Sequence, residues 1–132
     1  MGYGPVIVLD THAWLWWNGD DPLLSSRAAR EIDKAETIYI ASVSCFEIAT
    51  AVRRKRLQLD RDVLLWLREA LALPRVVLVP LSVEIAVSAG QLATRHGDRA
   101  DRIIAATALD FGIPVVTKDR RLRRIHGLAT VW

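Results

Sequence analysis

Apolar and polar residues alternate along this chain in blocks that predict strands separated by helices. Short apolar runs, typical of buried parallel strands, occur at residues 6–9, 38–40, 76–79 and 115–117. Between these runs, apolar residues recur at helical spacing, and each helical segment follows a residue that can cap a helix. The expected helix starts are Asp10 or Thr11, Ser25 or Ser26, Ser42 or Ser44, Asp60, Ser82 and Asp98.

Strands that alternate with helices predict right-handed crossovers and a parallel sheet with helices on both faces. The expected fold is therefore α/β, a three-layer sandwich of four to five strands, the fifth being a short edge strand at residues 128–131. The helix that starts at Ser82 is expected to run to about Arg95, where His96 and Gly97 would end it. The length of 132 residues suits one domain, so a single domain is expected over residues 1–132.

Four acidic residues share one kind of position in this pattern. Asp10, Glu47, Asp101 and Asp119 each lie just after a predicted strand or within the first turn or so of a predicted helix. In a parallel sheet such positions gather at the carboxyl ends of the strands, where α/β folds bind ligands. Carboxylates that lie close together repel one another, so ionising all of them costs free energy. A bound divalent cation lowers that cost. The pattern therefore predicts a metal site.

Each acid taken alone also has a structural explanation. Asp10 can cap the helix that follows it, and Asp98 with Asp101 has the spacing of a cap and a third helical residue. Ser44 and Glu47 have the S-x-x-E spacing of a capping box. The capping and metal-binding interpretations are compatible, because helix N-termini partly offset gathered negative charge.

Basic residues are clustered in a chain with a net charge of +3 and a pI of about 9.5. One block covers residues 53–56, and a second covers Lys118 and the arginines that follow it. Such blocks either keep a protein in solution or bind phosphate. An acid cluster inside a basic protein favours the second interpretation, because metal-dependent nucleases need both features.

Cysteine usage and hydropathy exclude other classes. The single cysteine, Cys45, excludes an internal disulfide and a multi-cysteine zinc site. A reducing cytoplasm is the expected compartment. Apolar runs all fall short of the roughly 20 residues needed to cross a bilayer, so no membrane role is expected.

Five segments of the chain match the motifs of a known family. They are V-L-D-T-H with L-W-W (8–17), D-P-L-L-S (21–25), S-V-S-C-F-E-I-A (42–49), H-G-D-R-A-D-R-I-I-A-A-T-A (96–108) and V-V-T-K-D (115–119). With these motifs the chain resembles the PIN-domain ribonucleases, specifically the VapC type of type II toxin–antitoxin systems. The segments occur in family order, and the stretch D-R-x-x-A-A-T-A with an upstream acid is quite specific. Arg99 stands where the family commonly has proline.

The resemblance implies a PIN-like fold and a divalent-metal-dependent endoribonuclease that is the toxin of a type II toxin–antitoxin pair. It makes Asp10, Glu47 and Asp101 the core acids and Asp119 the fourth, with Asp98 as a further candidate ligand. Mg²⁺ or Mn²⁺ would be the cofactor. Because magnesium takes one or two direct carboxylates, we expect Asp10 and Asp101 to bind it directly. Glu47 and Asp119 would then act through water or hold a second metal.

The implied partners are an RNA substrate, a cognate antitoxin protein and a second copy of the chain in a homodimer. The alternative interpretation is a non-catalytic PIN-like module that binds RNA or protein. For His12, two residues after Asp10, both a role at the site and simple packing remain open. The residues expected to contact substrate are Thr117, Arg102, Arg53, Arg54, Lys118 and Arg120.

Overall fold

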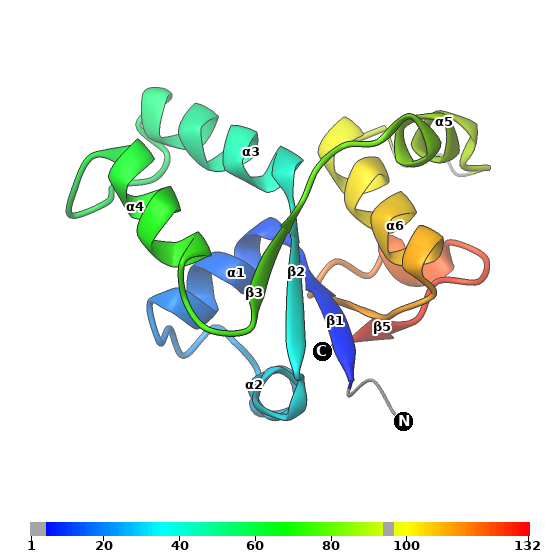
Figure 1. The fold of residues 1–132 in the computed structure, drawn as a ribbon, viewed down its shortest axis with the longest axis horizontal. Coiled ribbons are helices and arrows are strands. Elements are labelled where there is room, and N and C mark those ends of the chain that lie inside the picture. The colour runs from blue at the N-terminus through cyan, green and yellow to red at the C-terminus, as the bar shows by residue number, and fades with distance from the viewer. Residues whose placement is uncertain (1–4, 94–96) are drawn as a thin grey trace.

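The computed structural model describes residues 5–93 and 97–132 and has the expected three-layer α/β architecture. Five strands form one sheet in the order β3-β2-β1-β4-β5, and every neighbouring pair is parallel (Figure 1). The fifth, short edge strand lies within the range expected from the sequence. The strands are β1 (Val6–Leu9), β2 (Thr37–Ala41), β3 (Val76–Val79), β4 (Val115–Val116) and β5 (Thr130–Val131).

Helices cover both faces of the sheet. Figure 1 shows α1, α3 and α4 on one side of the strands and α5 with α6 on the other. The helices are α1 (Thr11–Asn18), α2 (Ser26–Lys34), α3 (Ser42–Arg53), α4 (Val63–Leu71), α5 (Val83–Gln91) and α6 (Arg99–Phe111), followed by the short 3₁₀ turn η1 (Leu122–Arg124).

The core is divided between the two faces by the alternation of side chains along each strand. Ile7 and Leu9 of β1 belong to the cluster that packs under α1 to α4, together with the fully buried Trp14. Val8, between them, packs on the opposite face with Ile104 of α6. The central strand is therefore buried on both sides, as its uninterrupted apolar run predicts.

Local capping sets most helix starts where the sequence places them. Asp10, Ser25, Ser82 and Asp98 each accept a hydrogen bond from the backbone N–H three residues later, at distances between 2.8 and 3.1 Å. Gly112 ends α6 with a φ of 65°, a conformation that glycine adopts without steric cost. Asp10 and Asp98 therefore have the capping role and also lie at the carboxyl edge of the sheet.

Two boundary predictions are wrong. The helix expected from Asp60 starts at Val63, and Asp62 caps it by accepting from two backbone N–H groups, whereas Asp60 pairs with Arg61. Helix α5 ends at Gln91, about one turn earlier than expected. The stop predicted at His96 lies outside the described residues.

Helix α3 begins at Ser42, one of the two expected starts, but the capping box predicted for Ser44 and Glu47 is wrong. Ala41 is in the capping position, so Ser44 and Glu47 lie inside the helix. Ser44 is fully buried instead, and its hydroxyl lies 2.9 Å from that of Thr11 on α1. Ser44 thus pairs with a residue 33 positions away in the sequence, in place of the predicted capping box.

Within the described ranges, none of the helices is both long and apolar enough to span a membrane.

Candidate active site

The acids predicted from the sequence come together in one pocket. Asp10 follows β1 and Asp119 follows β4, two neighbouring strands, while Glu47 and Asp101 lie on α3 and α6. The pocket has a volume of about 380 Å³ and is called the acid pocket below. Its lining residues are Asp10, Thr11, His12, Trp16, Glu47, Asp98, Asp101, Lys118, Asp119 and Arg121.

Asp10 is the most deeply buried of these acids, with 8% of its surface exposed. Its carboxylate accepts from the backbone N–H of Ala13 at 2.8 Å and hydrogen-bonds with the hydroxyl of Thr117. Burial raises the pKa of Asp10 above its ordinary value of 3.8, and these two hydrogen bonds oppose the shift without cancelling it. The ionised form is therefore costly in the protein alone, and a bound cation would stabilise it.

Glu47 is half-buried and is held by α1. The hydroxyl of Thr11, the residue after Asp10, donates to its Oε1 atom, and Ser44 hydrogen-bonds with the same hydroxyl. Burial raises the pKa of Glu47 above 4.5, and the negative charges of Asp101 and Asp98 add to this effect. The Thr11 hydrogen bond opposes the shift and sets the direction of the carboxylate.

The N-terminus of α6 supplies two acids. Asp98 caps the helix by accepting from the backbone N–H of Asp101 at 3.0 Å, and both side chains line the acid pocket. The positive end of the helix dipole lies at this position and favours the ionised carboxylates. Asp98 is thus both the cap of α6 and one of the acids that line the pocket.

Asp119 is paired with Arg121, a residue that the sequence analysis did not assign to the site. The guanidinium Nη2 lies 2.9 Å from Oδ2 of Asp119 and its Nε lies 3.1 Å from Oδ1. The backbone N–H of Arg121 also donates to Oδ1 at 2.9 Å. The D-x-R spacing was a usable signal, because an aspartate often accepts from the backbone two residues later.

The basic residues expected to contact substrate are divided among different places. Lys118 lines the acid pocket, with its Nζ atom 5.9 Å from the ring centroid of Trp16. Arg53 and Arg54 line a larger groove of about 1300 Å³, which shares residues with the acid pocket. Arg120 is exposed and is not among the described residues that line either cavity.

Arg102, which was expected to contact substrate, binds backbone carbonyls in the structure. Its Nε donates to the carbonyl of Ala89 at 3.1 Å and its Nη2 to that of Leu92 at 2.9 Å. These carbonyls lie at the end of α5, where helices leave acceptors unpaired. The side chain therefore ties α5 to α6 and is not among the described residues of the acid pocket.

Thr117, also expected to contact substrate, is buried beside Asp10. It is 1% exposed, hydrogen-bonds with Asp10 and accepts from the backbone N–H of Asp119 at 3.0 Å. One buried hydroxyl thus connects the acid after β1 to the segment after β4. Thr117 therefore supports Asp10, and its expected contact with substrate stays a prediction.

Aromatic rings form a row beside the acids, which the sequence analysis did not anticipate. The rings of His12 and Trp16 are 5.5 Å apart between centroids, and those of Trp16 and Trp132 are 5.7 Å apart. His12 and Trp16 line both the pocket and the groove. The row therefore connects the site to Trp132 through Trp16.

The donor set suits a hard divalent cation. Of the residues that the structure describes, no three His, Cys, Asp or Glu side chains are placed so that they could hold a metal ion together. Magnesium keeps several of its waters and takes one or two carboxylates directly, so three direct side-chain ligands are not required. The carboxylates of a pocket of this size therefore fit a hydrated Mg²⁺ or Mn²⁺.

An acidic pocket at the carboxyl edge of a parallel α/β sheet is an arrangement suited to metal-assisted hydrolysis. Residues 7–128 match the PIN domain family. The chain therefore belongs to this family, as the resemblance of its motifs implied.

One relative shows which type of PIN domain this is. The chain is 38% identical over 128 residues to Ribonuclease VapC22 of Mycobacterium tuberculosis, a match that covers 96% of this chain and 98% of that protein. This places the chain in the VapC type.

Solved structures show the same fold at low sequence identity. A chain of VapBC2 from Rickettsia felis, bound to a promoter DNA fragment, has a TM-score of 0.70 at 19% identity, over 95% of this chain and 96% of that one. A chain of DNA-bound VapBC from Salmonella typhimurium has a TM-score of 0.69 at 21% identity, over 96% of both chains. The PIN-like fold expected from the sequence is confirmed.

Proposed function

We propose that this VapC-type chain is a divalent-metal-dependent endoribonuclease and the toxin of a type II toxin–antitoxin pair. The observation that carries the proposal is the acid pocket, in which acids from four separate segments converge around the buried Asp10. The relatives support it, because one is named a ribonuclease and a structural neighbour is titled a toxin–antitoxin complex.

Mg²⁺ or Mn²⁺ is the proposed cofactor, held directly by Asp10 and Asp101 and through water by Glu47. Asp98 and Asp119 also line the pocket and are further ligand candidates. When bound, the dication would activate a water and stabilise negative charge on the phosphate.

The protein's own groups would then handle the proton and orient the water. Thr11 holds Oε1 of Glu47, which leaves Oε2 to accept a proton from the attacking water. Burial raises the pKa of Glu47, and a carboxylate whose pKa is closer to neutrality is a better proton acceptor. Thr117 and Ala13 fix the orientation of Asp10 in the same way.

RNA is the proposed substrate, and the larger groove is its proposed path. The groove shares lining residues with the acid pocket. Five arginines also line it: Arg53, Arg54, Arg56, Arg61 and Arg99. These side chains would bind phosphates, and the aromatic row beside the acids suits unpaired bases. Single-stranded or looped RNA is therefore the expected form.

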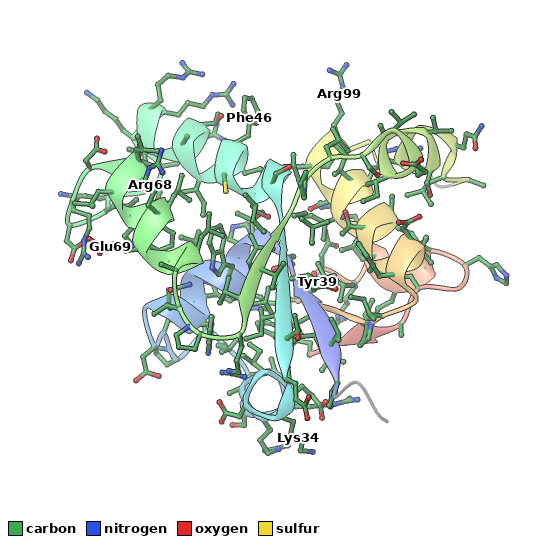
Figure 2. The ribbon with its side chains drawn as sticks, viewed as in Figure 1. Lys34, Tyr39, Phe46, Arg68, Glu69 and Arg99 are labelled. Atoms are coloured by element: carbon green, nitrogen blue, oxygen red, sulfur yellow. The ribbon has the colours of Figure 1, made fainter. Side chains whose placement is uncertain are left out.

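A cognate antitoxin and a second copy of the chain are the proposed protein partners. Phe46, which lies on α3 (Figure 2), also lines the groove. This residue is 71% exposed. A second apolar surface lies on α5, where Val83 is 76% and Val87 is 50% exposed. Exposed apolar patches of this kind mark protein contacts. Co-expression with the neighbouring gene, followed by measurement of the mass of the complex, tests both partners.

Cleavage of a fluorogenic RNA tests the proposed activity. The protein stripped of antitoxin should cleave with Mg²⁺ or Mn²⁺, and EDTA should stop the reaction. Asp10→Asn should be inactive under every condition. If RNA binds but remains intact with either metal, the non-catalytic module becomes the better interpretation.

A further inference from the structure

Arg121 is a cation that lies against one of the pocket acids, Asp119. Its Nε and Nη2 atoms pair side-on with the two oxygens of Asp119, at 3.1 and 2.9 Å. A guanidinium is a rigid planar fork, so this pairing turns the outer hydrogens of Nη1 and Nη2 away from that carboxylate. Those donors remain suited to a second anion. Because 62% of the Arg121 side chain is exposed, such an anion can reach it.

The pair is set in place by its neighbours before any ligand arrives. The backbone N–H of Asp119 donates to Thr117, which is buried beneath it. The next residue after Arg121 is Leu122, which is fully buried and packs in a core cluster with Ile125. Both ends of this short segment are therefore anchored, and the guanidinium is oriented at little further entropic cost.

The charge balance of the acid pocket requires cations near the phosphate. Five acids line it but only two cationic side chains do, Lys118 and Arg121, among the residues the structure describes. A phosphodiester is itself an anion, so one divalent ion does not offset all of this charge. The pKa of Arg121 is raised above its usual value, mainly by its hydrogen bond with Asp119 and also by the charges of Asp101 and Asp98. Its cation thus interacts with three of the five acids.

We propose that Arg121 binds a phosphate of the RNA at the mouth of the acid pocket, and that Asp119 is the positioning residue that holds it there. This inference rests on the proposed nuclease function and specifies it further. Asp119 then serves the reaction through Arg121, and the divalent cation is held by Asp10 and Asp101 without it. Arg120, one residue earlier, has the same charge but does not line the pocket, so it provides a matched control.

The first experiment compares Arg121→Gln with Arg120→Gln. Arg121→Gln should lower kcat/KM for RNA by roughly 100-fold, the size expected when one preorganised donor to a developing charge is lost. Its affinity for Mn²⁺, measured by calorimetry on the antitoxin-stripped protein, should stay within about twofold of wild type, since the metal ligands are unchanged. Arg120→Gln should change both quantities by less than about threefold, as expected for a peripheral phosphate contact.

The second experiment tests the positioning role of Asp119. Asp119→Asn should keep its Mn²⁺ affinity and lose activity to about the same extent as Arg121→Gln. The double variant should be hardly worse than either single one, because residues that act as a unit give non-additive losses. Added guanidinium ion should restore part of the activity of Arg121→Ala and none to Asp10→Asn.

Two results would overturn the inference. One is tighter Mn²⁺ binding by Arg121→Gln with activity kept or increased, which would make Arg121 a competitor of the metal for Asp119. The other is loss of Mn²⁺ binding in Asp119→Asn, which would make Asp119 a metal ligand. Failure of the proposed function is distinguishable from both, because the wild-type protein would then cleave no RNA with either metal.

Discussion

Two aspartates that follow neighbouring strands of the same sheet have opposite surroundings. Asp10, after β1, is 8% exposed, and its hydrogen-bond donors are the neutral Thr117 hydroxyl and Ala13 N–H. Asp119, after β4, has a side chain that is 23% exposed and pairs with Arg121. Among the residues that the structure describes, Asp119 thus has a cationic partner, whereas the hydrogen-bond donors of Asp10 are neutral. Asp10, the inner acid, is the one that a bound metal would stabilise most.

The largest effect should come from removing the charge of the inner acid. Asp10→Asn keeps the side-chain volume and the capping acceptor but removes the proposed metal ligand. We expect kcat for RNA to fall by roughly 1000-fold or more, in line with the loss of a principal electrostatic element. Single-turnover cleavage with Mg²⁺ and with Mn²⁺ measures it. Residual activity within tenfold of wild type would contradict a central role for Asp10.

The next effect concerns the hydroxyl that orients Glu47. Thr11→Val keeps the shape of a buried side chain and removes the hydrogen bonds to Glu47 and Ser44. We expect activity to fall by roughly 10-fold to 100-fold, the usual cost of losing a group that orients a metal-site ligand. Thr11→Ser, which keeps the hydroxyl, is the control. Equal activity in Val and Ser variants would show that Glu47 needs no such support.

A smaller effect should distinguish Arg53 and Arg54, which line the groove, from Arg102, which binds carbonyls at the end of α5. Replacing both Arg53 and Arg54 with Gln should reduce the dependence of log Kd on log salt by roughly one to two, about one for each phosphate that the variant no longer binds. Arg102→Gln should leave that slope unchanged and lower the free energy of unfolding by about 2 kcal/mol, because charged hydrogen bonds to carbonyls at the end of α5 are removed. RNA titrations at several salt concentrations and chemical denaturation measure the two quantities. If Arg102→Gln also lowered the slope of log Kd against log salt, Arg102 would be shown to bind an RNA phosphate.

The smallest effect is on the pH dependence of stability without metal. The folded protein binds the Asp10 proton more tightly than the unfolded chain does, because the folded pKa is raised above 3.8. The stability from this group is therefore fully present below pH 3.8 and is lost as the pH rises through the folded pKa. In EDTA, Asp10→Asn should lack this loss and be modestly more stable than wild type at neutral pH. Denaturation midpoints measured from about pH 3 to about pH 8 give the comparison, and identical curves for both proteins would refute it.

The strands and most helix starts were predictable because their causes are local. An apolar run of four residues, or a serine three residues before a backbone donor, has its effect within one turn of chain. The caps at Asp10, Ser25, Ser82 and Asp98 follow this rule, as does the αL glycine Gly112. The convergence of acids was also predictable, because parallel strands end at one edge of a sheet.

Errors appeared where a side chain had a choice of partners. Asp60 and Asp62 can both cap a helix, and the choice of Asp62 depends on where α4 packs. Ser44 and Glu47 have capping-box spacing, yet both are bound to Thr11 because α1 and α3 lie side by side. Sequence spacing limits which capping contacts a side chain can make, and tertiary packing determines which contact forms.

The sequence alone determined the α/β order, the sheet edge that gathers the acids and the PIN-type motifs that identify them. Only the tertiary structure decided how each charge is used, since Arg102 reaches the end of α5 while Arg121 reaches Asp119. A long, flexible arginine can reach many acceptors, and the energy of each pairing depends on burial and neighbours that lie far away in sequence. Local backbone conformation depends mainly on residues that are adjacent in sequence. The partner of a charged side chain is fixed only when the helices pack against the sheet.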